Sequence, residues 1–143
     1  LSADNAGDHR VYESGDDRAS VPIRLETLDG LLLDQQQERR RVRIIKSDTQ
    51  GYEPFVLRGA GRLIARDLPT LLFEYWPFGY AQAHADGEAM LRDLRARYPH
   101  AYVIEGDALQ RLDPLTLDDF LKLPGQAEGH RNLLFSKNPM TGK

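Results

Sequence analysis

Two apolar stretches of this chain end in residues that can do chemistry. The first, "VRII", leads into a run that combines an ammonium, two hydroxyls, a carboxylate, an amide and a glycine: Lys46, Ser47, Asp48, Thr49, Gln50 and Gly51. The second, "PTLLFEYW", places Glu74 close to its end, followed by Tyr75 and Trp76. Carboxylates in such positions can orient an acceptor hydroxyl or remove its proton.

Periodic patterns predict the elements that hold these residues. Period-two or continuous apolar patterns predict strands at residues 11–13, 21–26, 42–47, 69–76, 100–106, 109–113 and 131–138, and helical spacing predicts helices at 28–38, 53–67, 85–99 and 115–125. This alternation indicates an α/β fold, a doubly wound and mostly parallel sheet with an antiparallel strand at one edge. The 143 residues are expected to form one domain or part of one.

In open α/β sheets, ligands bind at the carboxyl ends of the strands. If the two apolar strands are neighbours, Asp48 and Glu74 lie roughly 5–10 Å apart at one pocket mouth. Structural roles compete with this interpretation: Asp48 is also typical of a turn cap, and Glu53 of a first helical turn. For Trp76 the competing structural role is a lid over the strand ends, and Lys46 is a candidate ion-pair partner for Glu74.

Three segments together resemble the FkbM family of methyltransferases. The opening "TLD" at residues 27–29 matches the start of the family pattern, and "IIKSDTQGYEPFVLRGA" matches its central part. The matched central positions are Lys46, Asp48, Gly51, Glu53, Val56, Leu57, Gly59 and Ala60. Glu74 matches the acid that ends the next strand, and "LSADNAGDHRVYES" resembles the family's preceding segment, so the resemblance extends over nearly the whole chain.

The resemblance implies a Rossmann-like class I fold that transfers a methyl group from S-adenosylmethionine to a hydroxyl of a sugar or polyketide-like molecule. It implies catalytic roles for Asp48, Glu74 and Lys46. The implied cofactor-binding residues are Asp4, Asp48, Gln50 and Glu53. Tyr75 and Trp76 are expected to border the acceptor pocket, and aromatic faces favour a sulfonium cation. His84, in the loop that follows, is either an acceptor-binding general base or a plain surface histidine.

The family's glycine-rich cofactor loop has no counterpart here, because "RGAGR" lies inside a helical pattern. The chain is therefore expected to be the C-terminal part of such a domain, with weak or no cofactor binding and no turnover by itself. An exposed sheet edge beside residues 42–47 predicts a homo-oligomer. The alternative is a non-catalytic methyltransferase-like module that binds another protein.

The composition of the chain limits the classes of partner that it is expected to bind. The net charge of −3 and pI near 5.8 argue against nucleic acid, and "ERRRVR" is interpreted as a solvated helix end. No apolar run approaches the roughly 20 residues of a membrane span. The absence of cysteine excludes disulfides and zinc–thiolate sites within these residues and is compatible with a cytoplasmic location. No metal site is expected, because the acid pair lacks a third ligand.

Overall fold

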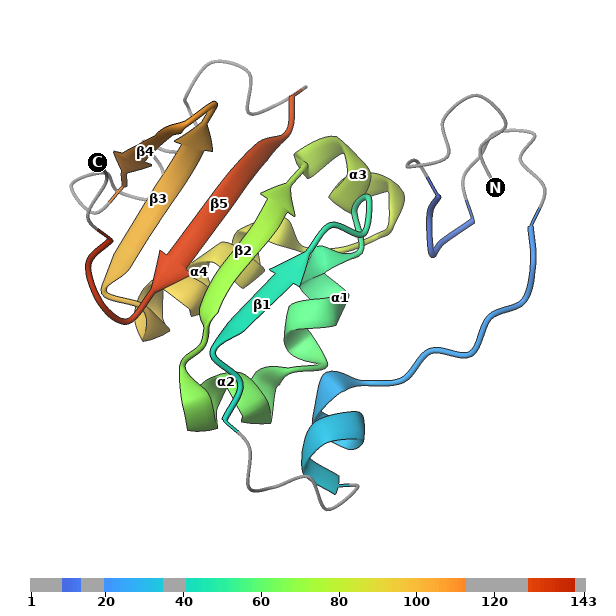
Figure 1. The fold of residues 1–143 in the computed structure, drawn as a ribbon. Helices are drawn as coiled ribbons and strands as arrows, with labels where there is room; N and C mark the ends of the chain where they lie inside the picture. Colours follow the sequence, from blue (N-terminus) through green and yellow to red (C-terminus); the bar gives the residue numbers. More distant parts are fainter. Residues whose placement is uncertain (1–8, 14–19, 35–40, 113–128, 141–143) are drawn as a thin grey trace.

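A computed structural model describes residues 9–13, 20–34, 41–112 and 129–140. Its centre is a five-stranded sheet in the order β1-β2-β5-β3-β4 (Figure 1). The strands are β1 (Ile44–Ser47), β2 (Thr70–Tyr75), β3 (His100–Glu105), β4 (Ala108–Arg111) and β5 (Arg131–Ser136). The helices are α1 (Glu53–Arg58), α2 (Gly61–Asp67), α3 (Pro77–Gln82) and α4 (Gly87–Arg97), preceded by a π-helical turn, η1 (Gly30–Asp34).

The sheet is mixed and mostly antiparallel, so the prediction of a mostly parallel sheet is wrong. Only β1 and β2 pair in parallel, whereas β5 runs antiparallel to both β2 and β3, and β4 antiparallel to β3. The last strand lies inside the sheet and not at its edge. In this position side chains on both faces of β5 are buried, among them Leu133, Leu134 and Phe135.

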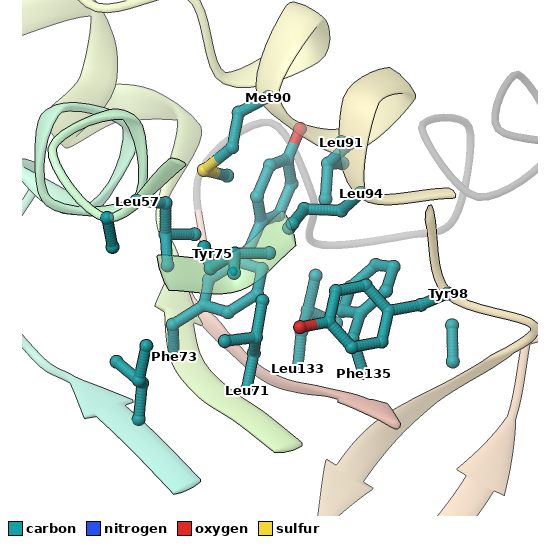
Figure 2. Packing of buried hydrophobic residues seen from close by; sticks show 14 of the residues in the cluster. Leu57, Leu71, Phe73, Tyr75, Met90, Leu91, Leu94, Tyr98, Leu133 and Phe135 are labelled. Carbon is teal, nitrogen blue, oxygen red and sulfur yellow. The ribbon is translucent and has the colours of Figure 1, made fainter. Parts of the chain in front are cut away.

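The core lies between the sheet and the helices α1, α2 and α4. Figure 2 shows Leu91 and Leu94 of α4 above Leu71 and Phe73 of β2. Phe73 and Phe135 of the neighbouring strand stack with ring centroids 5.8 Å apart. The α4 helix has the predicted helical pattern: Asp86 caps it by accepting the Ala89 N–H, and it ends before Pro99. These contacts hold β2 rigidly, so the tip that carries Glu74 has a defined position.

The predicted long helix at 53–67 is two helices, and Asp29 of the "TLD" motif accounts for the break. Its carboxylate accepts the N–H groups of Arg62 and Leu63, each at 2.9 Å. These are first-turn N–H groups of α2, which have no partner within the helix. Asp29 therefore caps α2 from a segment more than 30 residues earlier.

We expect Asp29→Ala to lower the free energy of unfolding by about 1–2 kcal/mol, because it leaves two N–H groups of α2 without their acceptor. Urea denaturation of the 143-residue chain measures this. Asp34→Ala is the control, since Asp34 only forms an exposed ion pair with Arg62. Equal losses in the two variants would contradict the capping role.

Several other elements differ from the predicted pattern. Residues 11–13 and 21–26 form no strand, and Val21, Ile23 and Leu25 of the second segment are more than half exposed. The helix α3 was not predicted, and the predicted helix at 115–125 lies outside the described residues. β1 is an edge strand of the sheet, with β2 as its strand neighbour in the described part of the chain.

Candidate functional site

The side chains of Asp48 and Glu74 converge at the carboxyl edge of the parallel pair β1 and β2. Ser47 pairs with Phe73, so the next residues of both strands lie side by side. The Gln50 side chain bridges the two carboxylates: Nε2 donates to Oδ1 of Asp48 at 3.1 Å and lies 3.4 Å from Oε2 of Glu74. Two acids and one amide thus form a cluster at the point predicted from the sequence.

Lys46 belongs to this cluster, but through Asp48. Its Nζ lies 3.4 Å from Oδ2 of Asp48, and both side chains are at least half exposed. Lys46 therefore forms an ion pair with Asp48, and not the predicted one with Glu74. Glu74 instead shares Gln50 with Asp48. The ammonium remains near enough to Glu74 to favour its charged form.

Glu53 builds the loop between β1 and α1 and is fully buried. Its carboxylate accepts the backbone N–H of Thr49, the Thr49 hydroxyl at 2.9 Å and the backbone N–H of Gly51 at 3.1 Å. Glu53 lies in the first turn of α1, as expected, where the helix dipole favours a carboxylate. With both oxygens engaged inside the protein, Glu53 supports the loop and does not reach a ligand at its surface.

The same loop turns through two left-handed residues. Gln50 has φ of 51° and Gly51 has φ of 100°, and glycine adopts such values most easily. A Cβ atom on Gly51 would lie 2.7 Å from the backbone carbonyl group of Gly79 in α3. The turn therefore packs against α3 backbone to backbone, which places Gln50 between the two strand tips.

Partial burial raises the pKa of Glu74, and the nearby charge of Asp48 raises it further. Glu53 acts in the same direction, whereas His130 and Lys46 lower the pKa. The net effect is a carboxyl that holds its proton more strongly than an exposed glutamate. A raised pKa moves a carboxylate toward the range in which it is an effective general base.

The raised pKa of Glu74 predicts how the free energy of unfolding depends on pH. Because the folded state binds the proton more tightly than the unfolded state, this group stabilises the fold at low pH and loses that contribution as pH rises through the folded pKa. We expect Glu74→Gln to match the wild type below the ordinary value of 4.5 and to become more stable above it. The gain should stay under about 1 kcal/mol, because solvent screens a half-buried carboxylate. Urea denaturation from pH 4 to 8 measures it, and a stability loss at pH 8 would contradict it.

The three predicted acceptor-binding residues, Tyr75, Trp76 and His84, have different surroundings. Tyr75 is 3% exposed and points into the core (Figure 2). Its ring meets the ring of Tyr80 edge-on, with the centroids 5.4 Å apart. Burial raises its pKa to about 12. His84 lines a groove of about 460 Å³ between α1 and α4, a groove that none of the acids at the strand tips lines. The structure therefore groups neither residue with Asp48 and Glu74.

Trp76 does remain at the strand tips. Its ring lies against Gly79, where any Cβ would clash with it, and Phe78 packs beside it with a centroid distance of 5.7 Å. The Arg10 guanidinium carbon lies 5.5 Å from the Trp76 ring centroid, a cation–π geometry. Trp76 thus packs between α3 and Arg10, and its predicted roles as a lid or as an acceptor-binding residue stay predictions.

Sequence reasoning missed the contribution of residues 9–13. Tyr12 donates its hydroxyl to the backbone carbonyl of Gln50 at 3.1 Å, although 38 residues separate them. The short apolar pattern there indicated a strand and carried no signal for this contact. Asp4, a predicted cofactor-binding residue, lies outside the described residues.

Two general features can be stated for the described part of the chain. It contains no group of three or more His, Cys, Asp or Glu side chains that could hold a metal ion. Within residues 9–13, 20–34, 41–112 and 129–140, no helix has the length and apolar character needed to cross a bilayer.

Residues 1–99 match the family model described as the methyltransferase FkbM domain. The match includes the cluster of Asp48, Gln50 and Glu74 but ends before β3, so it is shorter than the resemblance expected over nearly the whole chain. Neither a curated protein nor a solved structure matches the chain significantly.

Proposed function

Because the chain belongs to the FkbM methyltransferase domain family, we propose that it forms part of an enzyme that transfers a methyl group from S-adenosylmethionine to a hydroxyl oxygen. The proposed acceptors are sugar or polyketide-like small molecules. One observation carries the proposal: two carboxylates, Asp48 and Glu74, share one amide at the carboxyl edge of parallel strands. This edge is where open α/β sheets bind their ligands.

The residues present fit part of a cofactor site. The carboxylate of Asp48 is exposed and accepts hydrogen bonds, so it suits the α-ammonium group at the methionine end of S-adenosylmethionine. The Gln50 amide offers both a donor and an acceptor next to it. Glu53 supports these two through the loop backbone, because its oxygens already bind Thr49 and Gly51. When bound, S-adenosylmethionine supplies an electrophilic methyl group.

Glu74 is the better candidate for the proton acceptor. Its raised pKa and partial burial suit a general base, whereas Asp48 is exposed and paired with Lys46. With S-adenosylmethionine bound, the acceptor oxygen would bond to the methyl carbon as the carbon–sulfur bond breaks and S-adenosylhomocysteine leaves, and Glu74 would take up the hydroxyl proton. The Gln50 amide holds the carboxyl group of Glu74 in place. The reaction then requires that the acceptor hydroxyl is aligned with the methyl group.

The proposal is tested by incubating the full-length protein with methyl-labelled S-adenosylmethionine and a panel of sugar and polyketide alcohols. Matching amines and thiols serve as competing acceptors. We expect label in a methyl ether of one alcohol class. Label on nitrogen, sulfur or carbon would overturn the hydroxyl acceptor, and calorimetry with no binding of S-adenosylmethionine would overturn the enzyme proposal.

A further inference from the structure

The segment of residues 9–13 contacts a residue that follows β1 and a residue that follows β2. At one end, Tyr12 donates its hydroxyl to the Gln50 backbone carbonyl at 3.1 Å in a partly buried contact. At the other end, the Arg10 guanidinium lies over the Trp76 ring at 5.5 Å. Gln50 follows β1 and Trp76 follows β2, so a third stretch of chain links the tips of both strands.

The contact with residues 9–13 acts on the backbone of Gln50. Gln50 is a non-glycine residue at φ of 51°, a left-handed conformation that needs support from its surroundings. The next residue, Gly51, is held against Gly79, which restrains one side of the turn. The Tyr12 hydroxyl binds the Gln50 carbonyl and restrains the other side.

The orientation of this peptide determines where the Gln50 side chain points. Its amide reaches Asp48 at 3.1 Å and Glu74 at 3.4 Å, and the second contact is close to the limit of a hydrogen bond. A small rotation of the backbone would break the contact with Glu74 first. The carboxylate would then lose a donor that favours its charged form.

We infer that Tyr12 is a positioning residue, which sets the Gln50 amide between Asp48 and Glu74 by holding the Gln50 carbonyl. The Arg10–Trp76 contact anchors the same segment to the second strand tip. This inference rests on the proposed function for its kinetic consequence, but its structural content concerns the environment of Glu74 alone. Among the described residues, the titratable groups that influence the pKa of Glu74 are Asp48, Glu53, His130 and Lys46, and Tyr12→Phe replaces none of them.

The test is Tyr12→Phe, read first by NMR. In the 143-residue chain labelled with ¹³C at glutamate carboxyls, Glu74 is identified from its missing signal in Glu74→Gln and is titrated. We expect the pKa of Glu74 to rise in Tyr12→Phe and to stay at the wild-type value when 3-fluorotyrosine, which keeps the hydroxyl, replaces Tyr12. An unchanged pKa in Tyr12→Phe would overturn the inference, whatever the protein's activity.

The matched control is Tyr102→Phe, which removes a hydroxyl that accepts the Met140 N–H at 2.9 Å at a distant place in the sheet. It should leave the pKa of Glu74 unchanged. Introducing Tyr12→Phe into Gln50→Ala should likewise have no further effect on that pKa, because the amide is already absent. A pKa change in Gln50→Ala that doubles on adding Tyr12→Phe would show an independent effect and overturn the inference.

The kinetic readout uses the full-length protein. Tyr12→Phe should lower kcat about tenfold, since misplacing a supporting group costs one to two powers of ten. The acid limb of its pH–rate profile should move to higher pH, because the pKa of Glu74 rises. If the wild type transfers no methyl group, the proposed function fails, yet the NMR titration still decides the role of Tyr12.

Discussion

Glu74→Gln is expected to lower kcat for methyl transfer by about 10²–10⁴-fold, the usual contribution of a general base. Glutamine keeps the size of the side chain and its contact with Gln50, but it cannot accept the hydroxyl proton. Asp48→Asn is expected to raise the KM for S-adenosylmethionine more than it lowers kcat, because Asp48 is proposed to bind the cofactor. Steady-state kinetics of the full-length protein with labelled methyl donor separate the two outcomes.

Asp93→Asn provides the control for these variants. Asp93 lies on α4, where its exposed carboxylate pairs with Arg97 four residues later, and its loss should leave kcat and KM within about twofold, as expected of an exposed pair. If Glu74→Gln retained full kcat while Asp48→Asn lost it, the proton acceptor would be Asp48. Full activity in both variants would remove the acid pair from the mechanism.

Gly51→Ala is expected to destabilise the fold by about 3 kcal/mol or more, from strain in the left-handed conformation and overpacking together. The added Cβ would lie 2.7 Å from the carbonyl carbon and oxygen of Gly79, and backbone atoms of α3 cannot turn aside as a side chain can. Urea denaturation of the 143-residue chain measures the loss. Any folded Gly51→Ala protein should also lose the Gln50 bridge between the two acids.

Alanine substitutions at two other glycines separate the effect of backbone strain on stability from the effect of the steric clash. Gly106 has φ of 57° with no atom within 4 Å of an added Cβ, so Gly106→Ala carries strain alone, about 1 kcal/mol. Gly61 has neither feature and lies at the start of α2, where alanine should stabilise by up to about 1 kcal/mol. A Gly51→Ala loss no larger than that of Gly106→Ala would show that the turn does not pack against α3 as described.

The three acids near the strand tips differ in burial and in their contacts. Glu53 is completely buried and binds three donors of its own loop. Asp48 and Glu74 keep contact with solvent and share a single amide. This difference is the reason why the proposed reaction uses Asp48 and Glu74 and leaves Glu53 a supporting role.

Local sequence determined the parts of this protein that depend on short-range patterning. The polar run after "VRII", the acid at the end of "LLFEYW" and the amphipathic pattern of α4 all form where they were predicted. Neighbouring apolar strands joined by helices brought Asp48 and Glu74 to one edge of the sheet. The strands and the helix follow from periodicity, which the sequence carries directly, whereas the pairing of β1 with β2 was only a condition of the prediction and is supplied by the structure.

Tertiary structure decided everything that joins distant residues. The β5 strand enters the sheet between β2 and β3, which no local pattern specifies, and this made the sheet mostly antiparallel. Asp29 divides one predicted helix into two, and Tyr12 reaches Gln50 across 38 residues. Side-chain direction at the strand tips separated Glu74 from Tyr75, because successive residues of a strand face opposite sides of the sheet. Contacts of this kind depend on which segments meet in space, and only the folded chain determines that.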